Sequence, residues 1–109
     1  MEPISLESVR ERHDADKGPY CEFLREGELS VGRYVLPAGG DDPQTPHTED
    51  EVYYVLDGLA GIDIDGAVHP VEPGDVVYVG RGVEHRFVDI ERPLELLVVF
   101  APPEDSLAG

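Results

Sequence analysis

The chain has 109 residues, of which 24 are acidic and 8 basic, giving a formal net charge of −16. This length corresponds to one small domain. The negative charge repels phosphate backbones and anionic membranes, which argues against nucleic acid and membranes as partners. The chain has no apolar run of about 20 residues that could span a membrane. Because it also lacks the features of a secretory signal and has a single cysteine, we expect a cytoplasmic protein.

The first 19 residues are expected to form a polar arm. Ser5 can act as the N-cap of a short helix that runs through Arg12. His13 in this arm, and His69 further along the chain, are expected to be solvated. The barrel domain is expected over residues 20–101, and residues 102–109, which begin with two prolines, are expected to form a disordered tail.

Apolar runs separated by glycine and proline predict about eight to ten short strands. Asp57-Gly58 is expected to form a tight turn between two of them, and the Pro- and Gly-rich residues 37–43 a loop. Such a pattern is typical of an all-β sandwich or barrel. The predicted strands are Tyr20–Arg25, Glu28–Leu36, Val52–Leu56, Leu59–Asp65, Val68–Val71, Val76–Val79, His85–Ile90 and Leu94–Phe100.

Metal-competent side chains gather where one strand begins. His47, Glu49 and Glu51 have the same parity as Tyr53, so an extended chain directs all four to one face. Residues two apart on a strand lie roughly 6.6 Å apart and can share an ion, whereas residues four apart lie roughly 13 Å apart and cannot. The backbone must therefore bend between His47 and Glu51 if the two share an ion.

The glycines and ligand-type residues form two spaced motifs. The first contains Gly39, Thr45-Pro46-His47, Glu51 and Gly58, and the second contains Gly74, Gly80-Arg81-Gly82, His85 and Asp89. Over residues 28–101 the chain thereby resembles a single-domain small cupin of the cupin 2 conserved-barrel type. The resemblance implies an all-β double-stranded β-helix, or jelly-roll barrel. Three positions depart from the pattern: Thr45 replaces a histidine, Gly80 a proline and Asp89 an asparagine.

Cupins commonly hold a divalent metal with three histidines and one glutamate, so the resemblance implies metal ligands at His47, Glu51 and His85. A second alignment takes His47 as the first histidine and brings Glu49 near the ion instead. Two imidazoles and one carboxylate form a facial triad with open positions, which suits Fe(II) and also accepts Mn, Zn, Ni or Cu. The alternative is that both histidines are merely hydrogen-bonded barrel residues.

Three further residues are candidates for substrate binding. Tyr53 and Phe87 share the parity of the ligands, although core filling is the commoner role for such residues. Arg81 lies in the turn before His85 and could attract a substrate carboxylate, although a surface salt bridge is the commoner role.

Three classes of function are consistent with these residues. The first is a metal-dependent enzyme, with dioxygenase as the leading guess beside isomerase and decarboxylase, acting on a small molecule in the barrel mouth. The second is a non-catalytic module that binds a small ligand or metal. The third is a barrel with a decayed site that is kept for assembly. No residue is assigned a catalytic role.

A homodimer is also expected. Val52, Tyr54 and Leu56 point away from the ligand face, and a strand that is apolar on both faces must be covered on both. Two-fold pairing is the commonest arrangement of soluble oligomers.

Overall fold

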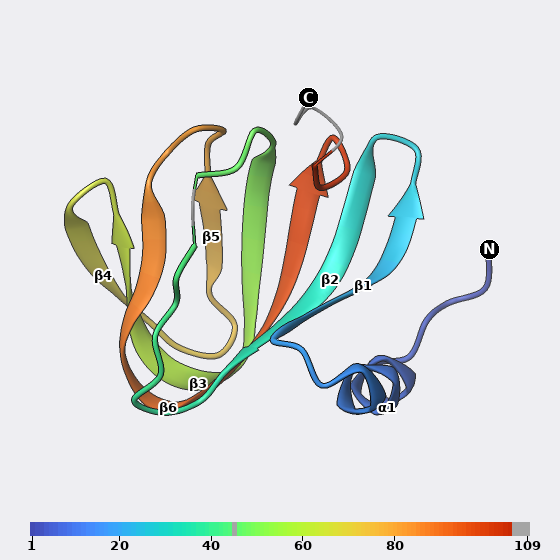
Figure 1. Cartoon of the computed structure of the whole chain (residues 1–109), viewed down its shortest axis with the longest axis horizontal. Helices are drawn as coiled ribbons and strands as arrows, with labels where there is room; N and C mark the ends of the chain where they lie inside the picture. Colours follow the sequence, from blue (N-terminus) through green and yellow to red (C-terminus); the bar gives the residue numbers. More distant parts are fainter. Residues whose placement is uncertain (45, 106–109) are drawn as a thin grey trace.

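The computed structural model describes residues 1–44 and 46–105, and Thr45 lies outside them. Its strands form one antiparallel sheet in the order β1-β2-β6-β3-β4, with β5 paired to β3 (Figure 1). The predicted all-β barrel class is confirmed. The elements are α1 (Leu6–Asp16), β1 (Tyr20–Glu26), β2 (Leu29–Leu36), β3 (Asp50–Ile64), β4 (Ala67–Val71), β5 (Val76–Val79) and β6 (His85–Ala101).

Two long strands replace four predicted short ones. β3 has 15 residues and β6 has 17, so the prediction of eight to ten short strands is wrong over these segments. The expected turn at Asp57-Gly58 is instead an irregularity within β3, where the register with β6 shifts. Gly58 has φ +106°, and a Cβ there would lie 2.4 Å from the Pro93 carbonyl oxygen. Glycine at this point allows the strand to bend while it continues.

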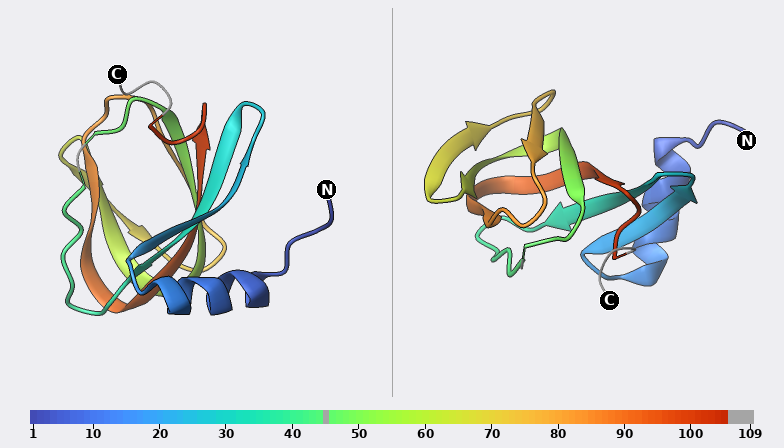
Figure 2. Two further views of the ribbon diagram at one scale, coloured as in Figure 1. Left: turned by 45° about the vertical axis from the view of Figure 1, so that its right-hand side comes forward. Right: turned by 90° about the horizontal axis from the view of Figure 1, so that it is seen from above.

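The bent strands enclose the core. The first half of β3 pairs with β5 and its second half with β4, while both halves pair with β6. The sheet therefore curls around its inner face, and residues 37–49 run along the open side (Figure 2). This segment is fixed to β6, because Gly39 N donates to Ile90 O at 2.9 Å and Phe87 N donates to Asp42 Oδ2 at 2.8 Å. The fully buried side chains of this core include Tyr53, Val55, Leu94 and Leu96.

Helix α1 begins as the sequence predicts and ends later. The Ser5 side chain accepts a hydrogen bond from Ser8 N, and the helix continues to Asp16. His13 is buried rather than solvated, because its ring nitrogens contact Gly18 O and Arg33 Nη1. The exposed His69 agrees with its expected solvation. No helix in the described ranges is long and apolar enough to cross a membrane.

The segment after β6 returns to the sheet. Glu104 N donates to the buried Ser30 hydroxyl at 2.9 Å, and Asp105 N donates to Glu49 Oε1 at 2.9 Å. Glu104 and Asp105 of the expected disordered tail are thus held by hydrogen bonds. Residues 106–109 lie outside the described ranges.

Candidate metal centre

Three predicted ligands come together at one end of the barrel. His47 ends the 37–49 segment, Glu51 lies near the start of β3, and His85 is the first residue of β6. Their candidate ligand atoms all lie within 4.8 Å of one another. The backbone bends at residues 48–49 before β3 begins, which provides the bend that the spacing of His47 and Glu51 requires. Gly82 N donates to His47 O at 2.7 Å and ties this segment to the turn before β6.

The contact between His85 and Glu51 favours a cation. His85 Nδ1 lies 2.9 Å from Val83 O, an acceptor, so Nδ1 carries the proton and Nε2 is left with a lone pair. Nε2 lies 2.9 Å from Glu51 Oε1, with side-chain exposures of 1% and 2%. Despite this distance, Glu51 Oε1 receives no well-directed hydrogen bond from any described residue. Two buried lone pairs at this separation require a proton or a metal ion, so the residues fit a divalent cation.

The electrostatics at His85 point the same way. Burial is the largest single influence on the pKa of His85 and lowers it. The Glu51 carboxylate, the Val83 carbonyl and the charge of Asp42 more than offset burial, so the pKa is raised above its ordinary value. The surroundings of this ring therefore favour positive charge, whether as a proton or as a metal ion.

Tyr53 adds a hydroxyl group beside the ligands. Its oxygen lies 3.0 Å from His85 Nε2 and 3.0 Å from Gln44 Oε1. Burial raises the pKa of Tyr53 well above its ordinary value, with a further contribution from the charge of Glu51, so the phenol stays protonated. The predicted substrate contact Phe87 packs edge-on behind Tyr53, with ring centroids 4.9 Å apart. Phe87 supports Tyr53 and does not line the cavity beside the ligands.

Asp42 organises the loop around this centre and was not identified from the sequence. It is buried and accepts hydrogen bonds from Tyr34 Oη, Gln44 Nε2 and Phe87 N. Through Gln44 it orients Tyr53. A run of Gly, Asp and Pro in a loop contains no periodic signal for such a role.

Glu49 belongs to a second group. His47, Glu49 and Asp105 also place candidate ligand atoms within 4.8 Å of one another. Both Glu49 oxygens already accept hydrogen bonds, Oε1 from Asp105 N and Oε2 from Thr48 Oγ1. Glu51 Oε1 accepts none from the described residues, so the geometry favours Glu51 over Glu49 as the carboxylate ligand.

A cavity of about 260 Å³ opens beside the ligands. Arg81 does not line it: its Nε lies 3.5 Å from Asp50 Oδ1, and its side chain is 55% exposed. Several lining residues come from parts of the chain that the sequence did not assign to the site. The lining consists of Tyr20, Tyr34, Pro43, Gln44, His47, Glu51, Tyr53, Val98, Phe100 and Glu104.

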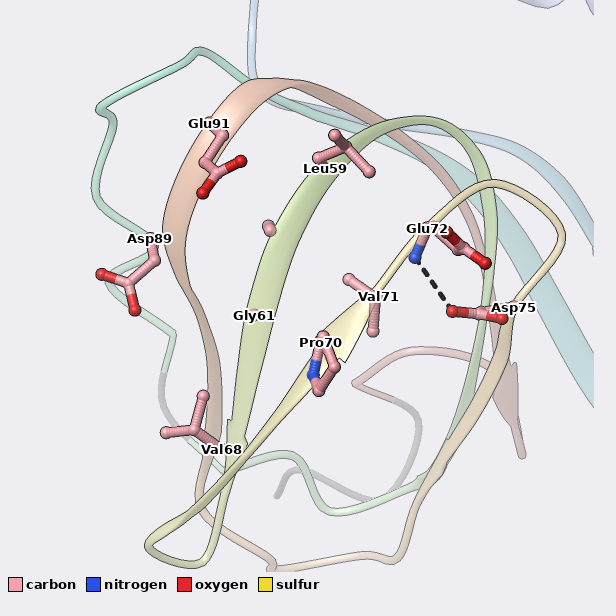
Figure 3. Close-up of a pocket in the computed structure, with 10 residues that line it drawn as sticks. Leu59, Gly61, Val68, Pro70, Val71, Glu72, Asp75, Asp89 and Glu91 are labelled. Atoms are coloured by element: carbon pink, nitrogen blue, oxygen red, sulfur yellow. Dashed lines mark hydrogen bonds between the residues drawn. The ribbon is translucent and has the colours of Figure 1, made fainter.

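A larger hollow of about 550 Å³ lies elsewhere, between β4 and the middle of β3. It contains no histidine, and its carboxylates are spread around the rim instead of converging (Figure 3). Asp75 is engaged there by the backbone of Glu72 at 2.9 Å. Volume alone would select this hollow, but the convergence of ligand-type side chains selects the smaller cavity.

Comparison with known proteins agrees with the fold. The family model described as a cupin domain matches residues 32–100. An uncharacterized protein of Streptomyces coelicolor is 45% identical over 104 residues, which cover 95% of this chain and 99% of that protein.

Two solved structures extend the comparison. The DMSP lyase DddQ from Ruegeria pomeroyi is 27% identical with a TM-score of 0.69, and the match covers 75% of this chain and 45% of that one. This chain thus spans less than half of that enzyme. KdgF from Halomonas sp. has a TM-score of 0.72 at 19% identity, with 81% of both chains covered, a likeness of fold alone.

Proposed function

This chain belongs to the cupin family, and from that premise we propose that it binds a divalent metal and acts on a small organic molecule in the barrel mouth. One observation carries the proposal: His47, Glu51 and His85 converge within 4.8 Å, and the buried Glu51 Oε1 lacks a hydrogen bond from the described residues. Three protein ligands leave coordination positions open for a ligand.

Each residue has a distinct part in this proposal. The two imidazoles donate neutral nitrogens, and Glu51 supplies the negative charge. A divalent ion in such a site supplies Lewis acidity or, as Fe(II), the capacity for oxygen chemistry. Tyr53 offers a protonated hydroxyl 3.0 Å from His85 Nε2, and the buried Val98 and Phe100 exclude water from one wall.

As the reaction class we propose dioxygenase chemistry, because two histidines and one carboxylate with open positions suit Fe(II) and oxygen. A non-oxidative reaction is the second candidate. It is favoured by the likeness to the DMSP lyase and by the Tyr53 hydroxyl, which stays protonated and can donate a hydrogen bond to negative charge that develops on a substrate. Oxygen uptake by the Fe(II)-loaded protein during a small-molecule screen separates the two, since only oxidation consumes oxygen.

Metal content is the direct test. Protein purified without added metal is expected to contain one Fe, Mn, Zn, Ni or Cu ion per chain by elemental analysis. His47→Ala and His85→Ala should each lose it, whereas the exposed His69 provides a matched control, and His69→Ala should retain it. A wild-type protein that stays empty after dialysis against each of these ions contradicts the proposal.

A further inference from the structure

We propose that the cavity beside the metal centre binds a ligand that carries a compact organic cation, which is held by Tyr20, Tyr34 and Glu104. The inference rests on the proposed function, because it describes the end of the ligand that lies away from the metal. It names a ligand class: a small molecule with an oxygen donor at one end and an ammonium-like group at the other.

Three aromatic rings form one wall of the cavity. The ring centroid of Tyr20 lies 6.2 Å from that of Tyr34 and 6.3 Å from that of Phe100, with interplanar angles of 68° and 78°. All three residues line the cavity. The electron-rich face of an aromatic ring attracts a cation within about 6 Å of its centroid, so several rings around one small space favour a positively charged group.

Tyr20 packs closely against Gly32 in this wall. A Cβ at Gly32 of β2 would lie 2.1 Å from the Tyr20 ring, so the ring rests directly on the backbone of β2. The Tyr20 hydroxyl is buried and has no hydrogen-bond partner in the described part of the chain. Buried hydroxyl groups are usually satisfied, so an orphaned one in a cavity wall points to a polar partner that binds there.

One carboxylate in the cavity wall is not a proposed metal ligand. Glu104 lines the cavity, and no lysine or arginine among the described residues does. The backbone of Glu104 is anchored, since its N–H donates to Ser30 Oγ at 2.9 Å and its carbonyl accepts from Arg25 Nη2 at 3.0 Å. No described cation pairs with its carboxylate. Burial first, and then the charges of Asp105 and Glu22, raise the pKa of Glu104 to about 7. A cation that enters the cavity relieves this repulsion.

Tyr20 and Glu104 lie outside the part of the chain that the cupin family model matches. The cupin model matches residues 32–100, whereas Tyr20 lies in β1 and Glu104 follows β6. The cupin core therefore supplies the candidate metal ligands, and the flanking segments supply the outer wall. The volume of about 260 Å³ lies below the usual range for drug-sized ligands, so the ligand must be small.

Choline and 3,3-dimethylbutan-1-ol provide a charge-only comparison, because they share a shape and a hydroxyl group and differ by the cationic nitrogen. In calorimetric titrations of metal-loaded protein at physiological salt, choline should bind about tenfold more tightly or better. Glu104→Gln and Tyr20→Leu should each remove most of this preference. Tyr20→Phe should keep the ring contribution. Glu72→Gln, which removes an exposed charge at the distant hollow, should leave the preference unchanged.

The outcomes distinguish the two proposals when metal content is measured on the same samples. Loaded protein that binds both probes equally, or neither at millimolar concentration, overturns the cation site and leaves the metal proposal intact. Protein that cannot be loaded overturns the proposed function and this inference with it. A cation preference that survives Glu104→Gln and Tyr20→Leu reflects the overall charge of −16 and overturns the assigned residues.

Discussion

Glu49 and Glu51 both lie within reach of His47, and they differ in what their oxygens already accept. Glu49 receives hydrogen bonds from Asp105 N and Thr48 Oγ1, whereas Glu51 Oε1 receives none from the described residues. We therefore expect Glu51→Ala to weaken metal binding by about 100-fold or more, since removal of groups that only support a ligand already costs 10–100-fold. Competition with a chelating dye measures this affinity.

Glu49→Ala is the paired variant. It should retain the metal and lose the hydrogen bond from Asp105 N, whereas Glu104 stays anchored to Ser30 and Arg25. If Glu49→Ala empties the site while Glu51→Ala does not, the metal is bound by the group of His47, Glu49 and Asp105, and the alternative alignment is correct.

Gly58 permits a second prediction about a single residue. A Cβ there would collide with the Pro93 carbonyl oxygen at 2.4 Å, whereas Gly66, which also has positive φ, has nothing within 4 Å of a Cβ. Gly58→Ala should therefore lower the free energy of unfolding by about 2 kcal/mol more than Gly66→Ala. Urea unfolding of both variants measures the difference. Equal losses would mean that backbone conformation alone requires Gly58.

Spacing in the sequence points to the candidate ligands but not to their surroundings. His47, Glu51 and His85 stand at fixed intervals within two motifs, so one sequence suffices to select these three residues, and the structure brings them together. Asp42 acts through contacts to Tyr34, Gln44 and the distant Phe87, and no local pattern encodes such contacts. The sequence predicts a disordered tail at Glu104, because no local pattern shows that the backbone there is anchored to Ser30. This anchoring depends on how β2 and β6 pair.

At the scale of elements, one carboxylate joins α1 to two strands of the sheet. Glu95 Oε1 of β6 lies 2.6 Å from Arg10 Nη2 of α1, and Glu95 Oε2 lies 2.7 Å from Arg33 Nε of β2. Arg33 in turn contacts His13 of α1. The hydrogen bond from Arg10 is the largest influence on the pKa of Glu95 and lowers it; Arg33 adds to this effect, and burial opposes it.

The sign of the resulting pH dependence follows from linkage. The Glu95 carboxyl group has a lower pKa in the folded state than its ordinary value of 4.5. Its contribution to stability is therefore fully present above pH 4.5, and it is lost as the pH falls from 4.5 through the lowered pKa of the folded state. Wild type should therefore lose more unfolding free energy between pH 6 and about pH 3 than Glu95→Gln. Urea unfolding at each pH measures this, with the exposed Glu28→Gln as the control. Parallel curves for wild type and Glu95→Gln would show that the attachment contributes nothing measurable.

The predicted strand boundaries agree with the structure where a turn ends the strand. β1, β2 and β5 begin and end within a residue of expectation. The errors fall at Asp57-Gly58 and at Pro93, which are both strong turn signals. These residues face each other across the register shift between β3 and β6, where a glycine with positive φ and a proline without an N–H fit the irregular ladder. A turn signal and a bulge signal use the same residue types, and only the pairing distinguishes them.

At the scale of the whole molecule, part of the outer face of the sheet is apolar and uncovered. Tyr54 of β3 pairs with Val76 of β5 and Leu97 of β6, and Val52 pairs with Tyr78 and Val99. Tyr54, Val76 and Tyr78 are 42%, 66% and 62% exposed. Helix α1 covers the neighbouring region around Glu95, but no described element lies over this patch.

We expect two copies of the chain to pair through this patch. A standard interface buries roughly 800 Å² per partner, and a charge of −16 opposes association only within the Debye length of about 8 Å at physiological salt. Association should therefore strengthen as salt rises. Sedimentation of wild type should give twice the chain mass of 12.0 kDa. Val68→Glu, an exposed control on β4, should give the same doubled mass. Tyr54→Glu combined with Tyr78→Glu should give the single-chain mass, because the double variant places like charges at the centre of the contact. A wild-type mass near 12.0 kDa at micromolar concentration would mean that the patch is exposed in the free protein, because α1 does not reach it.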